Sequence, residues 1–113
     1  MVVVPSEVGP LLATDLYQIV DTSDVPGGVV NIVTGLRSEV VPALERHDDV
    51  DGIWHFGSAE DARGVERAST GNMKRTGVSY GRARDWFDRR QGQGEEFLRE
   101  ATQVKNIWVP YGE

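Results

Sequence analysis

The chain of 113 residues has no cysteine, which excludes disulfides, thiolate metal sites and a cysteine nucleophile within it. Basic residues are also scarce, because 12 lysines and arginines face 18 acids and leave a formal net charge of -6. Nucleic-acid binders usually present a basic face, so we expect no nucleic-acid partner. No apolar run approaches the roughly 20 residues of a membrane-spanning helix, and the first residues lack the basic region of a signal peptide. We therefore expect no membrane association and a cytoplasmic protein.

The composition that remains is typical of a folded domain, with 39% hydrophobic and 27% charged residues. Short β-branched or aromatic runs alternate with stretches whose apolar residues recur at helical spacing. This alternation predicts an α/β fold, namely a partial Rossmann-like parallel sheet flanked by helices. The expected strands cover residues 2–4, 29–33 and 53–56, and the expected helices cover residues 11–20, 38–44 and 62–68.

The most informative stretch is residues 50–61 (VDGIWHFGSAED), where an expected strand leads through Gly57 and Ser58 into a helix. Free backbone N–H groups and the positive end of the helix dipole meet at such a turn, which suits a phosphate group. Ser58 can act as N-cap, and Asp61 three residues later completes a capping-box pattern. The alternative interpretation is a well-capped helix with no ligand.

The composition changes after residue 80, and we predict three parts: residues 1–80, a polar linker at 81–94 and a C-terminal part at 95–113. Arginines and aspartates alternate in the linker, which favours a solvated surface, although the arginines could also serve an anionic partner. A short helix is expected from Glu95 to about Ala101. The apolar run from Val104 to Val109 is expected to be a strand that finds its partner outside the chain.

Other residues with reactive or aromatic side chains indicate no further catalytic or binding site. His47 and His55 lack the spacing of metal ligands, so we expect no metal site. Ser6 and Ser58 have no Gly-x-Ser-x-Gly context, and no catalytic triad can be assembled. The three tryptophans are expected to be packing anchors and not platforms for bases; they are Trp54, Trp86 and Trp108.

Three segments resemble the aldehyde dehydrogenase superfamily, in the family's order and with family-like spacing. They are residues 2–11 (VVVPSEVGPL), residues 25–35 (VPGGVVNIVTG) and residues 47–58 (HDDVDGIWHFGS). The first is similar to the strand that leads to a Pro-Ser-Glu helix start, and the second to the proline-glycine entry of the next strand. The third is similar to the following strand and its Gly-Ser turn. The resemblance implies a dinucleotide-binding half in residues 1–80.

The rest of the chain departs from that pattern. Residues 71–76 (GNMKRT) resemble the approach to the family's Glu-Leu-Gly-Gly strand, but Ser79 stands where the resemblance places the general-base glutamate. Residues 96–109 (EFLREATQVKNIWV) resemble the family's extreme C-terminus, whose last strand joins a sheet between subunits. The family's thiol nucleophile is absent, and its attack on the aldehyde is the covalent step. The resemblance therefore implies a truncated copy with no catalytic residue, inactive by itself.

The resemblance also assigns a cofactor site, for NAD or NADP. Glu7, Gly57 and Ser58 match its ribose and pyrophosphate contacts, and Gly35 matches the start of its glycine-rich turn. Val4 replaces a lysine that would donate to the ribose, and Leu36 follows Gly35 where a second glycine would allow close backbone approach. We therefore expect weak binding. Glu7 could equally be a plain acid at a helix start.

Two functions follow from the resemblance. In the first, a non-catalytic module assembles with or stabilises a partner through residues 104–109, the partner being a second copy or an active aldehyde dehydrogenase subunit. In the second, the chain is the NAD-binding component of an aldehyde-oxidising oxidoreductase. A remnant without function is a third interpretation, and the sequence identifies no aldehyde substrate.

Overall fold

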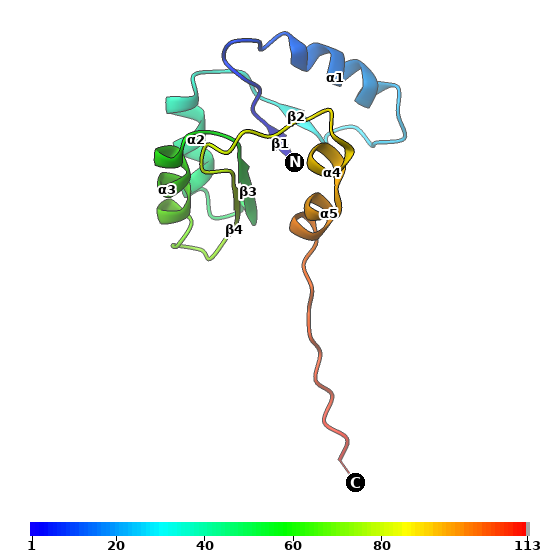
Figure 1. Cartoon of the computed structure of the whole chain (residues 1–113). Coiled ribbons are helices and arrows are strands. Elements are labelled where there is room, and N and C mark those ends of the chain that lie inside the picture. Colours follow the sequence, from blue (N-terminus) through cyan, green and yellow to red (C-terminus); the bar gives the residue numbers. More distant parts are fainter. Residues whose placement is uncertain (113) are drawn as a thin grey trace. The chain divides into compact units, whose positions relative to one another are not determined.

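The computed structural model describes residues 1–112, which divide into unit 1 (Met1–Val50) and unit 2 (from Asp51 onward). Each unit holds one pair of parallel strands joined through a helix (Figure 1). Parallel strands need such a crossover connection, so the predicted α/β class with parallel pairing is confirmed. The pairing is distributed over two two-stranded sheets. Among the described residues, no helix has both the length and the apolar character that crossing a membrane requires.

Unit 1 is built around very short strands. Val2 lies opposite Asn31 and Val3 opposite Ile32, and the N–H of Val33 donates to the carbonyl of Val3 at 3.0 Å. Ala13 is the apolar side chain that unit 1 buries among the described residues, whereas several large side chains of its first helix stay exposed. Its elements are β1 (Val2–Val3), α1 (Leu12–Asp21), β2 (Asn31–Ile32) and α2 (Arg37–Arg46).

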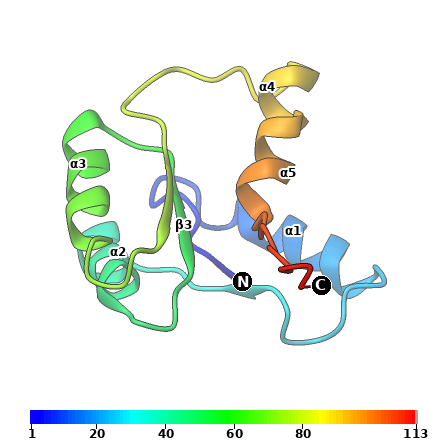
Figure 2. The same cartoon turned by 90° about the horizontal axis from the view of Figure 1, so that it is seen from below.

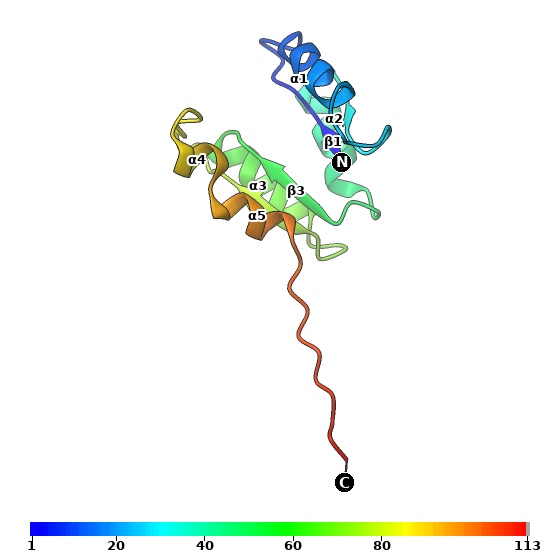
Figure 3. The same cartoon turned by 90° about the vertical axis from the view of Figure 1, so that its right-hand side faces the viewer.

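Unit 2 has the longer ladder, four residue pairs between β3 (Gly52–His55) and β4 (Arg75–Val78). The crossover helix α3 (Ala59–Ala68) contacts both strands and buries Ala62 and Val65, which lie three residues apart on one face. Two further helices follow, α4 (Arg89–Gln93) and α5 (Glu95–Ala101). Figures 2 and 3 show α3 on one side of β3 and α5 on the other.

Aromatic side chains fill the space between β3 and α5. The rings of Trp54 and Phe97 lie 5.5 Å apart, and Trp86 meets Phe56 edge-on at 5.0 Å. Gly77, paired opposite Trp54, leaves room for the indole, since a Cβ there would lie 2.9 Å from Trp54 Cδ1. Residues 84–101 therefore cover the sheet face opposite α3. Trp54 and Trp86 make ring contacts with other aromatic side chains but remain 43% and 51% exposed, so they are not buried anchors. The helix α4 falls inside the predicted polar linker.

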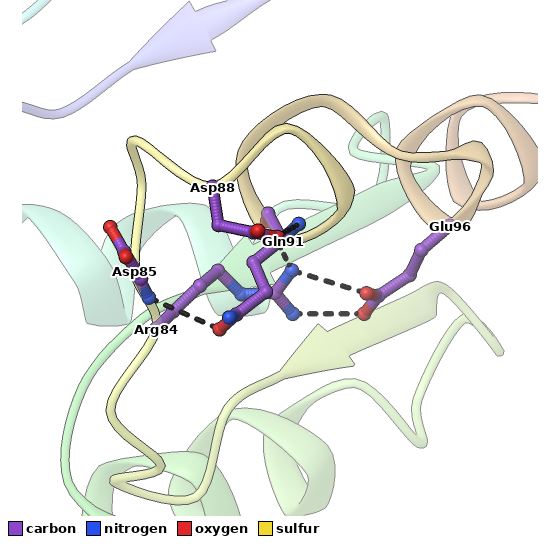
Figure 4. A network of polar contacts seen from close by, with 5 residues as sticks. All are labelled: Arg84, Asp85, Asp88, Gln91 and Glu96. Atoms are coloured by element: carbon purple, nitrogen blue, oxygen red, sulfur yellow. Dashed lines mark hydrogen bonds and ion pairs between the residues drawn. The ribbon is translucent and has the colours of Figure 1, made fainter.

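Arg84 contacts both the aromatic rings and the first turn of α5. Its guanidinium lies 5.1 Å from the Phe97 ring centre and donates to the Glu96 carboxylate at 3.0 and 3.1 Å (Figure 4). These hydrogen bonds lower the pKa of Glu96 and raise the pKa of Arg84. Because Glu96 is well exposed, the ion pair positions Arg84 more than it stabilises the fold.

The predicted strand from Val104 to Val109 is not formed within the chain. These residues carry no regular secondary structure and all are exposed. A strand exists only as part of a ladder, and no described segment of the chain pairs with this one. Trp108 is 91% exposed, so the expectation that it is a packing anchor is wrong within the chain.

Alanine substitutions at two glycines, one in the turn after β4 and one inside α3, should change the stability of the protein in opposite directions. Gly81 has a φ of +73°, so we expect Gly81→Ala to destabilise the protein by about 1 kcal/mol or more. Gly64 lies inside α3 with open space around it, so Gly64→Ala should stabilise by roughly 0.5–1 kcal/mol. Urea unfolding followed by tryptophan fluorescence measures both. Shifts of the same sign would contradict the assigned conformation of Gly81.

The Arg84–Glu96 ion pair predicts a pH dependence. The folded pKa of Glu96 lies below its ordinary value of 4.5, so the contribution is complete above that pH and is lost as pH falls through the folded pKa. We expect the near-ultraviolet circular dichroism of the wild type and of Glu96→Gln to differ at neutral pH and to converge in acid. A difference that persists unchanged at pH 2 would show that Glu96 acts through packing and not through its charge.

Candidate functional site

The turn between β3 and α3 is fixed by Ser58. Its backbone is extended, with φ -64° and ψ 163°, and its Oγ accepts a hydrogen bond from the N–H of Asp61 at 3.1 Å. The predicted N-cap is thereby confirmed. The first turn of α3 also carries the carboxylates of Glu60 and Asp61, which oppose an incoming anion at the same helix end.

The chain after β4 folds back onto this turn. The N–H of Gly81 donates to the carbonyl of Gly57 at 2.7 Å, and Ser79 Oγ donates to the same carbonyl at 3.3 Å. The N–H of Ser79 extends the ladder to the His55 carbonyl at 3.1 Å. Ser79 therefore serves as a donor that fastens two turns together. It supplies no carboxylate for proton abstraction at the position where the resemblance places a general base.

Tyr80 ties the same turn to α3. Its hydroxyl donates to the Glu66 carboxylate, and this hydrogen bond raises the pKa of Tyr80 above its usual range. Its φ of +52° is uncommon for a residue with a side chain. Sequence reasoning missed this contact, because the two residues lie 14 positions apart and neither belongs to a recognisable motif.

In unit 1, Glu7 and Gly35 both serve the start of α2. Leu36 is the N-cap of α2 and has no side-chain oxygen to offer, and the Glu7 carboxylate accepts the N–H of Arg37 from 30 residues away. Gly35 allows a close approach, since a Cβ there would lie 2.9 Å from Val40 Cγ2. Glu7 thus caps a helix, although not the one that follows it directly in the sequence.

Glu7 and Gly35 also border a cavity of about 620 Å³ in unit 1. Its walls are mainly apolar and come from the loop after β1, from α1 and from the end of β2, and they include Leu11, Tyr17 and Ile32. Ligand pockets usually measure roughly 300–1,000 Å³ and combine apolar walls with a few polar groups. The cavity thus combines apolar walls with one carboxylate, that of Glu7, among its lining residues.

The structure thus brings Glu7 together with Gly35 in unit 1, and Gly57 next to Ser58 in unit 2. Each of these two pairs contributes to the N-terminus of a helix, α2 or α3. The role of these residues in cofactor binding stays a prediction. His55 is buried beside α3 whereas His47 is exposed at the end of α2. Across residues 1–112, no group of three or more histidines and acids is placed to hold a metal ion.

Comparison with known proteins identifies the family that the chain resembles. The model of the aldehyde dehydrogenase family matches residues 1–83. An NADP/NAD-dependent aldehyde dehydrogenase of Escherichia coli is 38% identical over 78 residues, which are 68% of this chain and 16% of that protein. A solved aldehyde dehydrogenase of Bartonella henselae superposes with a TM-score of 0.65 at 31% identity, over 69% of this chain and 16% of that one. An indole-3-acetaldehyde dehydrogenase solved with NAD+ gives 0.64 at 35% identity, with 68% and 16% covered.

The match to the family model covers well over half of the chain and stops just after the turn at residues 79–81. The chain spans about one sixth of the length of these relatives, since 16% of each is covered. Over the matched residues, the backbone of the chain resembles that of the solved aldehyde dehydrogenases, as the superpositions show. On this evidence the chain belongs to the aldehyde dehydrogenase family.

Proposed function

We propose that the chain is a non-catalytic aldehyde dehydrogenase module that acts as an assembly or stabilising partner. The observation that carries the proposal is the exposure of its C-terminal apolar residues. Ile107 is 83% exposed and Trp108 is 91% exposed, and their backbone takes part in no ladder. Apolar side chains on an extended, unpaired segment are the features of a strand that adds to another sheet. The proposed partner is a second copy of the chain or an active aldehyde dehydrogenase subunit.

A non-catalytic role is supported by the residues at the chemical positions. No cysteine is present among the 113 residues, so the chain offers no thiolate nucleophile. Ser79 stands where the resemblance places the general base, and its hydroxyl donates to the Gly57 carbonyl. The chain can therefore contribute surface to an active enzyme, but it supplies neither of the two groups with which the resemblance associates the reaction.

Removing the apolar anchors tests the assembly. We expect the chain to be larger than its 12.5 kDa monomer in light scattering, and the double variant Ile107→Asp, Trp108→Asp to be monomeric. Burying the two side chains contributes about 3 kcal/mol or more, which corresponds to at least about a hundredfold in the dissociation constant. The matched control is Asn106→Asp with Gln103→Asp, which adds the same two charges to the segment and should leave the assembly intact.

The partner decides between the two forms of the proposal. If the chain alone is a monomer, the same light-scattering measurement is repeated with an active aldehyde dehydrogenase added. A complex that the Ile107→Asp, Trp108→Asp variant fails to form supports the role in a mixed assembly. A monomer in both measurements would refute the assembly role.

The second candidate is the NAD-binding component of an oxidoreductase. The cavity of about 620 Å³ beside Glu7 favours it, and a structural neighbour was solved with NAD+ bound. The resemblance assigns the ribose hydroxyls to Glu7 in unit 1 and the pyrophosphate to the Gly57–Ser58 turn in unit 2. Such binding would compete with the cap that Glu7 gives to α2 and would meet the carboxylates of Glu60 and Asp61.

Calorimetric titration of NAD separates the candidates. The variant Ser58→Asp keeps an N-cap oxygen and adds a negative charge where the pyrophosphate would lie, and Glu7→Gln keeps an acceptor for Arg37 without the charge. Saturable heat that disappears in the double variant would establish the cofactor role. The control Glu39→Gln with Gln103→Asp makes the same change in charge elsewhere. No heat with the wild type would eliminate this candidate and leave the assembly role unaffected.

A further inference from the structure

A second, smaller cavity lies in unit 2, where the end of β4 meets the segment leading into α5. Its volume is about 260 Å³, and three arginines and one glutamate are among the residues that line it. The arginines are Arg82, Arg84 and Arg90. Two of these three, together with the glutamate, lie beyond the part of the chain that the family model matches. None of the residues considered for a dinucleotide is among those that line this cavity.

Of the acids near this cavity, Glu96 is among the residues that line it, whereas Asp85 and Asp88 are not. Asp88 accepts the N–H groups of Arg90 and Gln91 at 3.0 Å, and Asp85 accepts the N–H of Phe87 at 3.0 Å. Both carboxylates are therefore committed to backbone groups. Among residues 1–112, neither Arg82 nor Arg90 forms an ion pair with a carboxylate. Arginines and aspartates alternate in the sequence, so the sequence alone does not indicate which arginines have a carboxylate partner.

Arg84 is the fixed side of the cavity. Its Nη1 donates to the Gln91 carbonyl at 2.7 Å, and both terminal nitrogens donate to Glu96. Its guanidinium also lies within 6 Å of the ring centres of Phe56, Trp86 and Phe97. With Glu96 paired to Arg84, the guanidinium groups of Arg82 and Arg90 are the two at the cavity without a carboxylate partner among the described residues.

We propose that this cavity binds the phosphoryl dianion of a small phosphate compound, held by Arg82 and Arg90 beside the fixed Arg84. Guanidinium groups match the oxygens of a phosphate in pairs, and two of them balance two negative charges. The volume lies below the roughly 300–1,000 Å³ of pockets for larger organic ligands, so the site fits a phosphoryl group and not a whole dinucleotide. The net charge of -6 repels anions from the chain in general, so saturable binding requires a local site of this kind.

Titration with inorganic phosphate, followed by tryptophan fluorescence at constant ionic strength, tests the proposal. Trp86 is a suitable reporter, because its ring lies 5.7 Å from the Arg84 guanidinium carbon. We expect saturable binding to the full chain. The variant Arg82→Gln, Arg90→Gln should weaken it at least about tenfold, since it removes the charge-assisted hydrogen bonds from both guanidinium groups.

The matched control is Arg67→Gln with Arg89→Gln, which removes the same two charges from α3 and α4 outside the cavity lining. It should bind phosphate as the wild type does. Circular dichroism verifies that both double variants are folded. Absence of saturable binding to the wild type, or equal weakening in the two double variants, would overturn the proposal.

A parallel titration with glycerol phosphate identifies the source of the phosphoryl group. Tighter binding than that of inorganic phosphate supports a phosphate monoester as the ligand, and equal binding supports free phosphate. Both results require the same loss in the Arg82→Gln, Arg90→Gln variant. Binding of either compound that this variant retains in full would also overturn the site.

Discussion

A pair of parallel strands has two faces, and both must be covered by other elements. Parallel sheets are found almost only where this condition is met. Unit 2 meets it with α3 on one face and with the rings of Phe97 and Trp86 on the other. Unit 1, by contrast, buries one alanine as its apolar core within the described residues. The difference explains why the residues beyond the family match matter to the fold, because they complete the covering of β3.

The residues expected to bind a cofactor illustrate a second constraint, that a helix start must be satisfied. Glu7 accepts an N–H of α2, and Ser58 accepts one of α3. The carbonyl of Gly57 receives the N–H of Gly81 from the turn after β4. In this chain, residues that the resemblance assigns to a dinucleotide also hold the backbone. Keeping the motif therefore preserves the conformation of the fragment, whether or not a ligand binds.

Local signals in the sequence were sufficient for several elements, but not for α4, for the C-terminal segment or for the contacts between distant residues. The cap at Ser58 and the helix from Glu95 to Ala101 follow from spacing and residue type, and both were predicted. The cover over β3 was not, because Trp54 and Phe97 are far apart in the sequence and the charged residues around Trp86 indicate a solvated linker. Trp54 and Phe56, two residues apart, were the available signal, since alternate residues of a strand share a face. The strand expected at Val104 is not formed, because no described segment of the chain pairs with these residues.

The C-terminal segment also has a bearing on self-association into fibrils. Exposed runs of six or seven residues with high strand propensity, low charge and no proline are the ones that stack into cross-β structure. Here the run is interrupted early, because Lys105 and Pro110 flank residues 106–109. A charge and a residue without an N–H are the means by which natural edge strands resist indefinite addition. The segment is therefore too short to template a growing stack.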